Sequence, residues 1–182
     1  MKNVIVSWAA ALGIALLASC AATRTHEAPG EYIDDAAITA SVKSALIADP
    51  VAKAYQIEVE TFRGVVQLSG FVGSKDERNT AESVAAHVKG VASVHNNLAV
   101  RAGKDTVGEV IDDSVLTTRV KAALVVNPVT KARQINVTTE RGVVQLSGFV
   151  DSATEKRTAT EVARTVAGVH DVRDELEMKS AP

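Results

Sequence analysis

The chain has 182 residues, of which 46% are hydrophobic and only 3% aromatic, and its formal net charge is −2. This nearly balanced charge argues against nucleic acid as a partner, because proteins that bind nucleic acid carry strong basic patches. A single cysteine excludes a disulfide within the chain and every metal motif that needs paired cysteines.

The N-terminal segment has the features of a secretory signal. Its apolar stretch, residues 4–17, is shorter than the roughly 20 residues that span a bilayer as a helix. The stretch ends in Leu17-Ala18-Ser19-Cys20, which resembles a bacterial lipobox. The resemblance implies cleavage after residue 19, acylation of Cys20 and, because Ala21 rather than Asp follows, anchoring in the outer membrane. An uncleaved anchor, or a chance cysteine after a secretory signal, is the alternative.

The rest of the chain contains one sequence pattern twice, 78 positions apart and without a gap. The longest identical stretch is Arg63–Val72, which recurs as Arg141–Val150. Self-similarity at a fixed period marks repeated structural units, and two copies indicate tandem domains. The predicted divisions are a signal peptide at 1–19, a flexible tether at 20–31, a first domain at 32–101, a linker at 102–109 and a second domain at 110–179.

Each domain begins with a predicted helix. In the first domain Ile38, Val42 and Leu46 recur at the spacing that places apolar residues on one face of a helix. The preceding Asp34-Asp35 pair is placed to cap the free amides at the helix start. The second domain repeats both features.

A hairpin follows the helix. Alternation over residues 57–61 predicts a half-buried strand, the Arg63-Gly64 pair predicts a turn, and residues 65–72 predict the returning strand. The two faces of that second strand carry Val66, Leu68 and Val72 on one side and Val65, Gln67, Ser69 and Phe71 on the other. Gly70 suggests a bulge or the close approach of another backbone.

A second helix and a third strand complete the domain. Ser74 and Glu77 match a capping box, as do Ser152 and Glu155 in the second domain. Gly90 is expected to end the helix, and residues 94–100 form the last strand. The predicted fold is therefore α+β, with an αββαβ order, a three-stranded mixed sheet and both helices on one face of it.

These motifs, found twice and in the same order, resemble the BON-domain family. The resemblance covers roughly residues 33–101 and 111–179, and is strongest for OsmY-like periplasmic proteins and DolP-like lipoproteins of the outer membrane. It implies a location in the periplasm and binding to phospholipid or envelope proteins rather than catalysis. In DolP-like proteins the first helix of the second domain carries an aromatic residue that engages lipid. Residues 112–127 contain no aromatic residue. This absence favours the role that the resemblance to OsmY-like proteins implies, which is to assist other envelope proteins, over direct binding of phospholipid.

Two surfaces are predicted to make contacts. With helices on one side of each sheet, the opposite face would expose Val65 and Phe71 in the first domain and Val143 and Phe149 in the second. We expect these faces to pack on each other or to bind a partner such as an outer-membrane or secreted client protein.

The second surface is the outer side of helix 112–126, which joins apolar and basic residues. Its members are Val115, Arg119, Lys121, Val125 and Val126. This combination is typical of helices that contact anionic phospholipid, although an ordinary solvated helix is the alternative.

No set of residues predicts catalysis, a cofactor or a metal site. Ser69 and Ser147 lie within strands, whereas a nucleophile elbow lies between a strand and a helix. The four histidines do not recur between the domains, and no convergent ligand set accompanies them. We therefore predict a protein without enzymatic activity.

Overall fold

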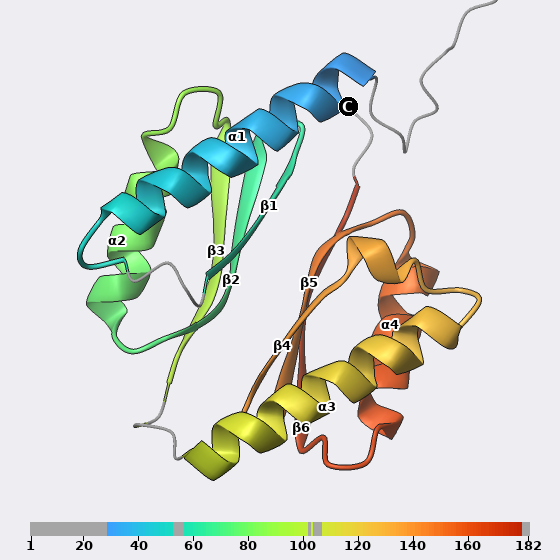
Figure 1. Ribbon diagram of the computed structural model, residues 1–182. Coiled ribbons are helices and arrows are strands. Elements are labelled where there is room, and N and C mark those ends of the chain that lie inside the picture. The colour runs from blue at the N-terminus through green and yellow to red at the C-terminus, as the bar shows by residue number, and fades with distance from the viewer. Residues whose placement is uncertain (1–28, 53–56, 102, 104–106, 180–182) are drawn as a thin grey trace, which may run out of the picture.

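The computed structural model of the protein describes residues 29–52, 57–101, 103 and 107–179. They form two units with the same order of α-helices and strands (Figure 1). The first unit contains α1 (Pro29–Ala48), β1 (Ile57–Phe62), β2 (Val65–Val72), α2 (Lys75–Ala86) and β3 (Ser93–Val100). The second unit contains α3 (Val107–Val126), the short 3-10 helix η2 (Ala132–Gln134), β4 (Asn136–Glu140), β5 (Val143–Val150), α4 (Ala153–Thr165) and β6 (Asp171–Met178).

Each unit has a three-stranded mixed sheet. The central strand, β2 or β5, pairs antiparallel with the strand before it and parallel with the strand after it. Both helices of a unit cover the same face of its sheet (Figure 1). The α+β fold with an αββαβ order is therefore confirmed.

Each unit also has its own apolar core between sheet and helices. Val42 and Leu46 of α1 are buried there, as the helical spacing predicts. The β2 face that enters this core carries Val66, Leu68 and Val72, so the predicted division of the strand into two faces is confirmed.

The starts of α1 and α3 differ from the prediction. α1 begins at Pro29, inside the segment predicted as tether, and α3 begins at Val107, inside the predicted linker. Asp35 therefore lies within a helix and caps no helix end. Its carboxylate accepts hydrogen bonds from the backbone amides of Arg63 and Gly64, with a distance of 2.8 Å to the Gly64 nitrogen.

Asp113 makes the same pair of bonds to the backbone amides of Arg141 and Gly142, at 2.6 and 2.9 Å. The turn that receives them has a positive φ at both of its residues, 51° at Arg141 and 75° at Gly142. The carboxylate thus ties the helix to the tip of the hairpin in each unit.

Replacing Asp35 by alanine should lower the free energy of unfolding by about 3 kcal/mol, because two hydrogen bonds to a charged acceptor are lost and two amides lose their partner. Urea denaturation checks this. Asp34→Ala is the matched control, since the Asp34 side chain is exposed and should change the free energy by less than about 0.5 kcal/mol. Equal effects of the two substitutions would contradict this role of Asp35.

The serine caps predicted for the second helices are confirmed, whereas each glutamate accepts from the amide one residue before its serine and not from the serine amide. The Ser74 hydroxyl accepts from the amide of Glu77 and the Ser152 hydroxyl from the amide of Glu155, both at 3.1 Å. The Glu77 carboxylate accepts in return from the amide of Gly73, at 2.7 Å.

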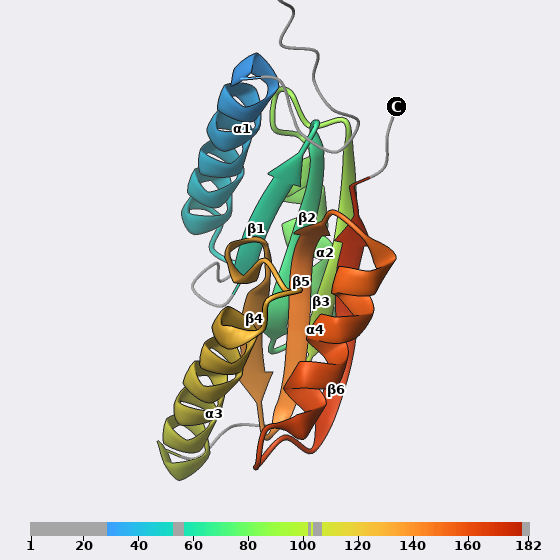
Figure 2. The ribbon, with the colours of Figure 1, turned by 90° about the vertical axis from the view of Figure 1, so that its right-hand side faces the viewer.

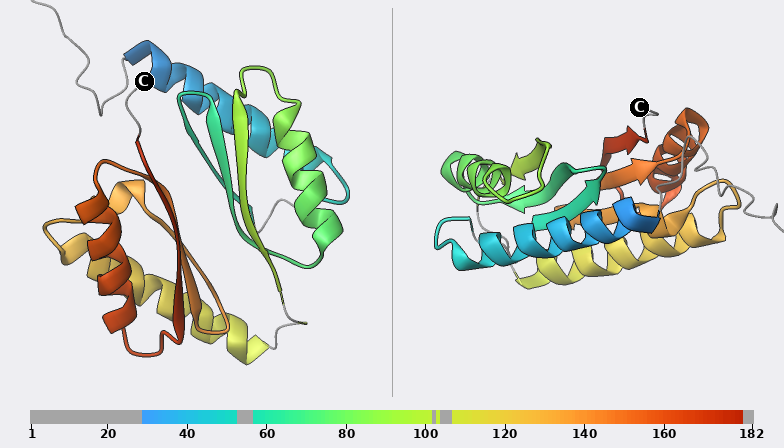
Figure 3. Two further views of the ribbon diagram at one scale, coloured as in Figure 1. Left: turned by 180° about the vertical axis from the view of Figure 1, so that it is seen from behind. Right: turned by 90° about the horizontal axis from the view of Figure 1, so that it is seen from above.

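The two units pack with their sheets in the middle and their helices outside (Figures 1 and 3). α1 and α3 lie on the same side of the molecule, one in each unit, and run in opposite directions (Figures 2 and 3). Over the described ranges, none of the helices combines enough length with enough hydropathy to span a bilayer. The signal peptide and Cys20 lie outside the described residues.

Candidate functional site

The sheet faces that carry no helices lie against each other. Phe71 and Phe149, two of the predicted contact residues, are only 8% exposed, and Val65 and Val143 are half-buried. The Phe149 ring packs on Phe62 of the other unit, with ring centroids 5.5 Å apart. In this structure each face is therefore covered by the face of the other unit.

The centre of this interface is polar. The hydroxyls of Ser69 and Ser147 form a buried hydrogen bond of 2.7 Å between the two units. Because each serine hydroxyl is engaged by the other, they join the two sheets at the midpoint of their central strands.

Two buried glutamines flank the serines and bind backbone groups of the facing unit. The Gln67 side chain donates to the carbonyl of Glu175 and accepts from the amide of Gly148, both at 2.7 Å. Gln145 donates to the carbonyl of Asn97 at 2.7 Å and accepts from the amide of Gly70 at 2.6 Å. We define Gln67, Ser69, Gln145 and Ser147 as the polar centre.

Sequence reasoning placed Gln67 and Ser69 on this face but did not identify the glutamines as site residues. A signal was present, because a fully polar glutamine interrupts an apolar strand at the same place in both repeats. Buried polar groups need hydrogen-bond partners. A glutamine at this position therefore predicts a facing surface with free donors and acceptors.

The rim of the interface carries charged and polar contacts between the two units. His95 Nδ1 lies 2.6 Å from Glu177 Oε2. Arg101 Nε lies 3.6 Å from Glu140 Oε2, and the side-chain amide of Asn136 donates to the Glu60 carboxylate at 2.9 Å. The rim contacts thus join unlike residues of the two units, whereas the polar centre joins residues that occur in both.

Near this rim, Asp151 lies between two lysines. It pairs with Lys131 and, at 3.0 Å, with Lys179, whose Nζ also lies 5.6 Å from the centre of the Phe62 ring. Burial alone would raise the pKa of the Asp151 carboxyl, but the hydrogen bonds and charges of Lys131 and Lys179 hold this pKa below its usual range.

The lowered pKa predicts acid sensitivity. A carboxyl whose pKa is lower in the folded state stabilises the fold above its unfolded-state pKa of about 3.9, and this stabilisation is lost as the pH falls through the folded-state pKa. Asp151→Asn should therefore lower the free energy of unfolding at neutral pH. Between neutral and acid pH, the free energy of unfolding should fall less in this variant than in the unaltered protein. Urea denaturation at pH 7 and pH 3 tests this, with the exposed Asp34→Asn as control. A decline in acid as steep as in the unaltered protein would contradict the prediction.

The five predicted lipid-contact residues of α3 are all exposed. Val125 and Val126 are 69% and 81% exposed, at the C-terminal end of the helix. On α1, which lies on the same side of the molecule, Ile47 is 75% exposed (Figure 2). The C-terminal ends of both long helices therefore carry exposed apolar side chains.

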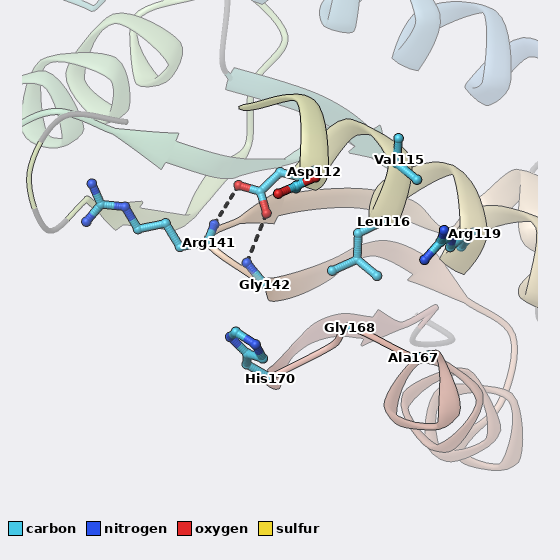
Figure 4. A pocket seen from close by; sticks show the side chains of 10 residues that line it. Asp112, Val115, Leu116, Arg119, Arg141, Gly142, Ala167, Gly168 and His170 are labelled. Atoms are coloured by element: carbon cyan, nitrogen blue, oxygen red, sulfur yellow. Dashed lines mark hydrogen bonds between the residues drawn. The ribbon is translucent and has the colours of Figure 1, made fainter. Parts of the chain in front are cut away.

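A pocket of about 510 Å³ lies between the first half of α3, the β4–β5 hairpin tip and the loop before β6 (Figure 4). Val115, Leu116, Arg119 and His170 contribute apolar and basic groups to its lining, and the Arg141 side chain extends away from Arg119 and His170. The first unit has Ser41 and Ala92 where the second has Arg119 and His170. Arg119 and His170 therefore have no basic counterpart in the first unit.

Of the two other histidines, only His87 lies within the described residues. The His87 ring contacts the carbonyl of Ser83, one turn earlier in α2, at 2.6 Å, and His26 lies outside the described residues. Among the described residues, no three His, Cys, Asp or Glu side chains gather in a group that could hold a metal ion.

Comparison with known proteins identifies the repeated unit. The model of the BON-domain family matches residues 34–102 and 112–180. Osmotically-inducible protein Y of Escherichia coli (strain K12) is 41% identical over 151 residues, which are 82% of this chain and 75% of that protein. Outer membrane lipoprotein DolP of Haemophilus influenzae is 33% identical over 144 residues, which are 79% of this chain and 74% of that protein.

Among solved structures, CdsD, a structural protein of the type III secretion system of Chlamydia trachomatis, matches with a TM-score of 0.32 and 17% identity. The match covers 79% of this chain and 63% of that structure, so this chain spans less than two thirds of its length.

Proposed function

The chain belongs to the BON-domain family, and from this premise we propose that it is a non-enzymatic periplasmic lipoprotein that supports the cell envelope by chaperoning or adapting envelope proteins. The lipobox-like residues before Cys20 support an outer-membrane anchor. The similarity to outer membrane lipoprotein DolP supports the same location.

The observation that carries the chaperone role is the chemistry of the polar centre. Gln67 and Gln145 already bind backbone carbonyls and backbone amides of a facing sheet. An unfolded polypeptide in an extended conformation offers the same groups, whatever its sequence. When the two units separate, these faces would bind such a client through its backbone, while Phe71 and Phe149 would contact its apolar side chains.

A disulfide across the interface tests this role. The Ser69→Cys/Ser147→Cys variant replaces a contact of 2.7 Å between two hydroxyls and should close the units covalently when oxidised. The reduced variant should slow aggregation of an unfolded outer-membrane barrel protein, and the oxidised variant should lose at least fivefold of this activity. Ser69→Cys alone, treated with the same oxidant, is the control. Equal protection by the locked and reduced forms would overturn the proposal.

A phospholipid-binding surface is the second candidate function. The pocket beside Arg119 and His170, together with exposed Val125 and Val126, combines basic and apolar groups that suit an anionic headgroup and its acyl chains. The chain without its predicted signal peptide, residues 20–182 with Cys20→Ala so that the acylation site is also absent, should then sediment with anionic vesicles. Arg119→Ser, which restores the residue of the first unit, should weaken this binding. No sedimentation with anionic vesicles would remove this candidate.

The anchor is tested by mass spectrometry of the mature protein. We expect an N-terminal Cys20 that carries acyl chains, in the outer-membrane fraction. An unmodified N-terminus in the cytosolic fraction would overturn the proposed location.

A further inference from the structure

The interface between the units is nearly symmetric about the Ser69–Ser147 hydrogen bond. The bond from Gln67 to the carbonyl of Glu175 has its counterpart, 78 positions along, in the bond from Gln145 to the carbonyl of Asn97. The bonds that the amides of Gly70 and Gly148 donate are related in the same way. All five bonds use side chains common to both units or backbone groups.

A surface with this property is self-complementary, since the same patch serves both partners. Either unit of one chain therefore carries the groups needed to bind a unit of another chain. The faces alone do not specify that the partner must belong to the same molecule.

The rim contacts decide which units pair. His95 faces Glu177, whereas in a pair of two first units it would face Ala99, the counterpart of Glu177. Phe149 packs on Phe62, whereas in a pair of two second units it would meet Glu140, the counterpart of Phe62. The full set of contacts forms only when a first unit meets a second unit.

We propose that the protein forms an exchanged dimer with a second copy of this chain, in which the first unit of each chain docks on the second unit of the other. In a single chain whose own two units pack together, each first unit contacts a second unit, and the exchanged dimer forms the same contacts between two chains. The monomer and the dimer therefore differ mainly in which units the chain connects. Domain exchange of this kind is a low-cost route to a dimer.

The connection sets the concentration at which exchange occurs. β3 ends at Val100 and α3 begins at Val107, so the two units are joined by a short stretch of chain. A short connection gives an effective concentration on the order of millimolar for the intramolecular pairing. The exchanged dimer should therefore form when the concentration of chains approaches this value, and dissociate on dilution after opening of the interface.

Cysteine cross-linking between two single variants tests the proposal. Mature chains, residues 20–182, carry either Ser69→Cys or Ser147→Cys, each with Cys20→Ala so that one thiol remains. They are mixed at about 1 mM, near the effective concentration, and then oxidised. We expect at least tenfold more disulfide-linked dimer from the mixture than from either variant alone. The control is a mixture of two single variants with exposed thiols on α1 and α3, Ser44→Cys and Ser114→Cys. The disulfide-linked dimer that it yields measures cross-linking by random collision.

The double variant Ser69→Cys/Ser147→Cys, oxidised at low concentration, must close as a monomer, which shows that the two thiols meet. With that closure, a mixture that yields no more dimer than the exposed pair overturns the proposal. Dimer from Ser147→Cys alone at the level of the mixture also overturns it, because that product requires two second units to pair. Neither result tests whether a chain with separated units binds a client protein. That question is tested by the aggregation assay with the oxidised and reduced Ser69→Cys/Ser147→Cys variant.

Discussion

Gly148→Ala should destabilise the second unit by about 4 kcal/mol or more, one of the largest effects expected of a single methyl group. A Cβ at this position would lie 2.2 Å from the carbonyl oxygen of Gln134, a backbone atom that cannot move aside without displacing the chain before β4. The backbone there also has φ of +117°, which side chains rarely adopt. The substitution therefore combines backbone strain with a steric clash at the centre of β5.

Gly168→Ala is the matched control. Gly168 has a similar φ of +100°, but a Cβ there would meet only the Leu116 side chain, at 3.6 Å. It should cost about 1 to 2 kcal/mol, from backbone strain alone. Urea denaturation of the full chain should show early unfolding of the second unit in Gly148→Ala only. Similar midpoints for the two variants would contradict the close approach at Gly148.

Gln145→Glu should separate the two units at neutral pH. The substitution keeps the shape of the side chain and the acceptor for the Gly70 amide, but it places a second carboxylate oxygen against the carbonyl of Asn97. Burying a charged oxygen against a carbonyl oxygen costs several kcal/mol, and a cost of about 3 kcal/mol changes an equilibrium constant by more than a hundredfold. Hydrogen exchange at the Gly148 amide, which bonds to the unaltered Gln67, should become at least a hundredfold faster.

Lowering the pH should reverse this opening. Burial raises the pKa of the introduced carboxyl, and its protonated form can donate to the Asn97 carbonyl as the glutamine does. Exchange at Gly148 should therefore slow towards the rate of the unaltered protein, after correction for intrinsic pH dependence. Gln67→Glu should behave in the same way, with Gly70 as the reporter. Unchanged protection of Gly148 at pH 7 in Gln145→Glu would contradict the role given to the polar centre.

The sequence predicted the fold of each unit because its signals are local. The apolar spacing around Val42, the alternation in the hairpin and the Ser74–Glu77 box each act within one helix or strand. The role of Asp35 had no such signal, because the amides that it binds lie 28 and 29 residues away. An acidic residue near a helix start has the same appearance whether it caps the helix or holds a distant turn.

The interface was only partly predictable for the same reason. Alternation places Gln67, Ser69 and Phe71 on the face without helices, but it cannot show what covers that face. The covering residues come from the other repeat, 78 positions away for the two serines. The pocket also depends on distant residues, since Arg119 and His170 line one cavity only after α3 packs beside the loop before β6.

The proposed use of the paired faces is tested most directly by hydrogen exchange at four glycine amides, with and without an unfolded outer-membrane barrel protein. Gly70 and Gly148 donate across the interface, whereas Gly64 and Gly142 donate to Asp35 and Asp113 within their own units. If clients bind the separated faces, the client should change exchange at Gly70 and Gly148 together and leave Gly64 and Gly142 unchanged. A bound client with all four amides exchanging as in the free protein would contradict the account.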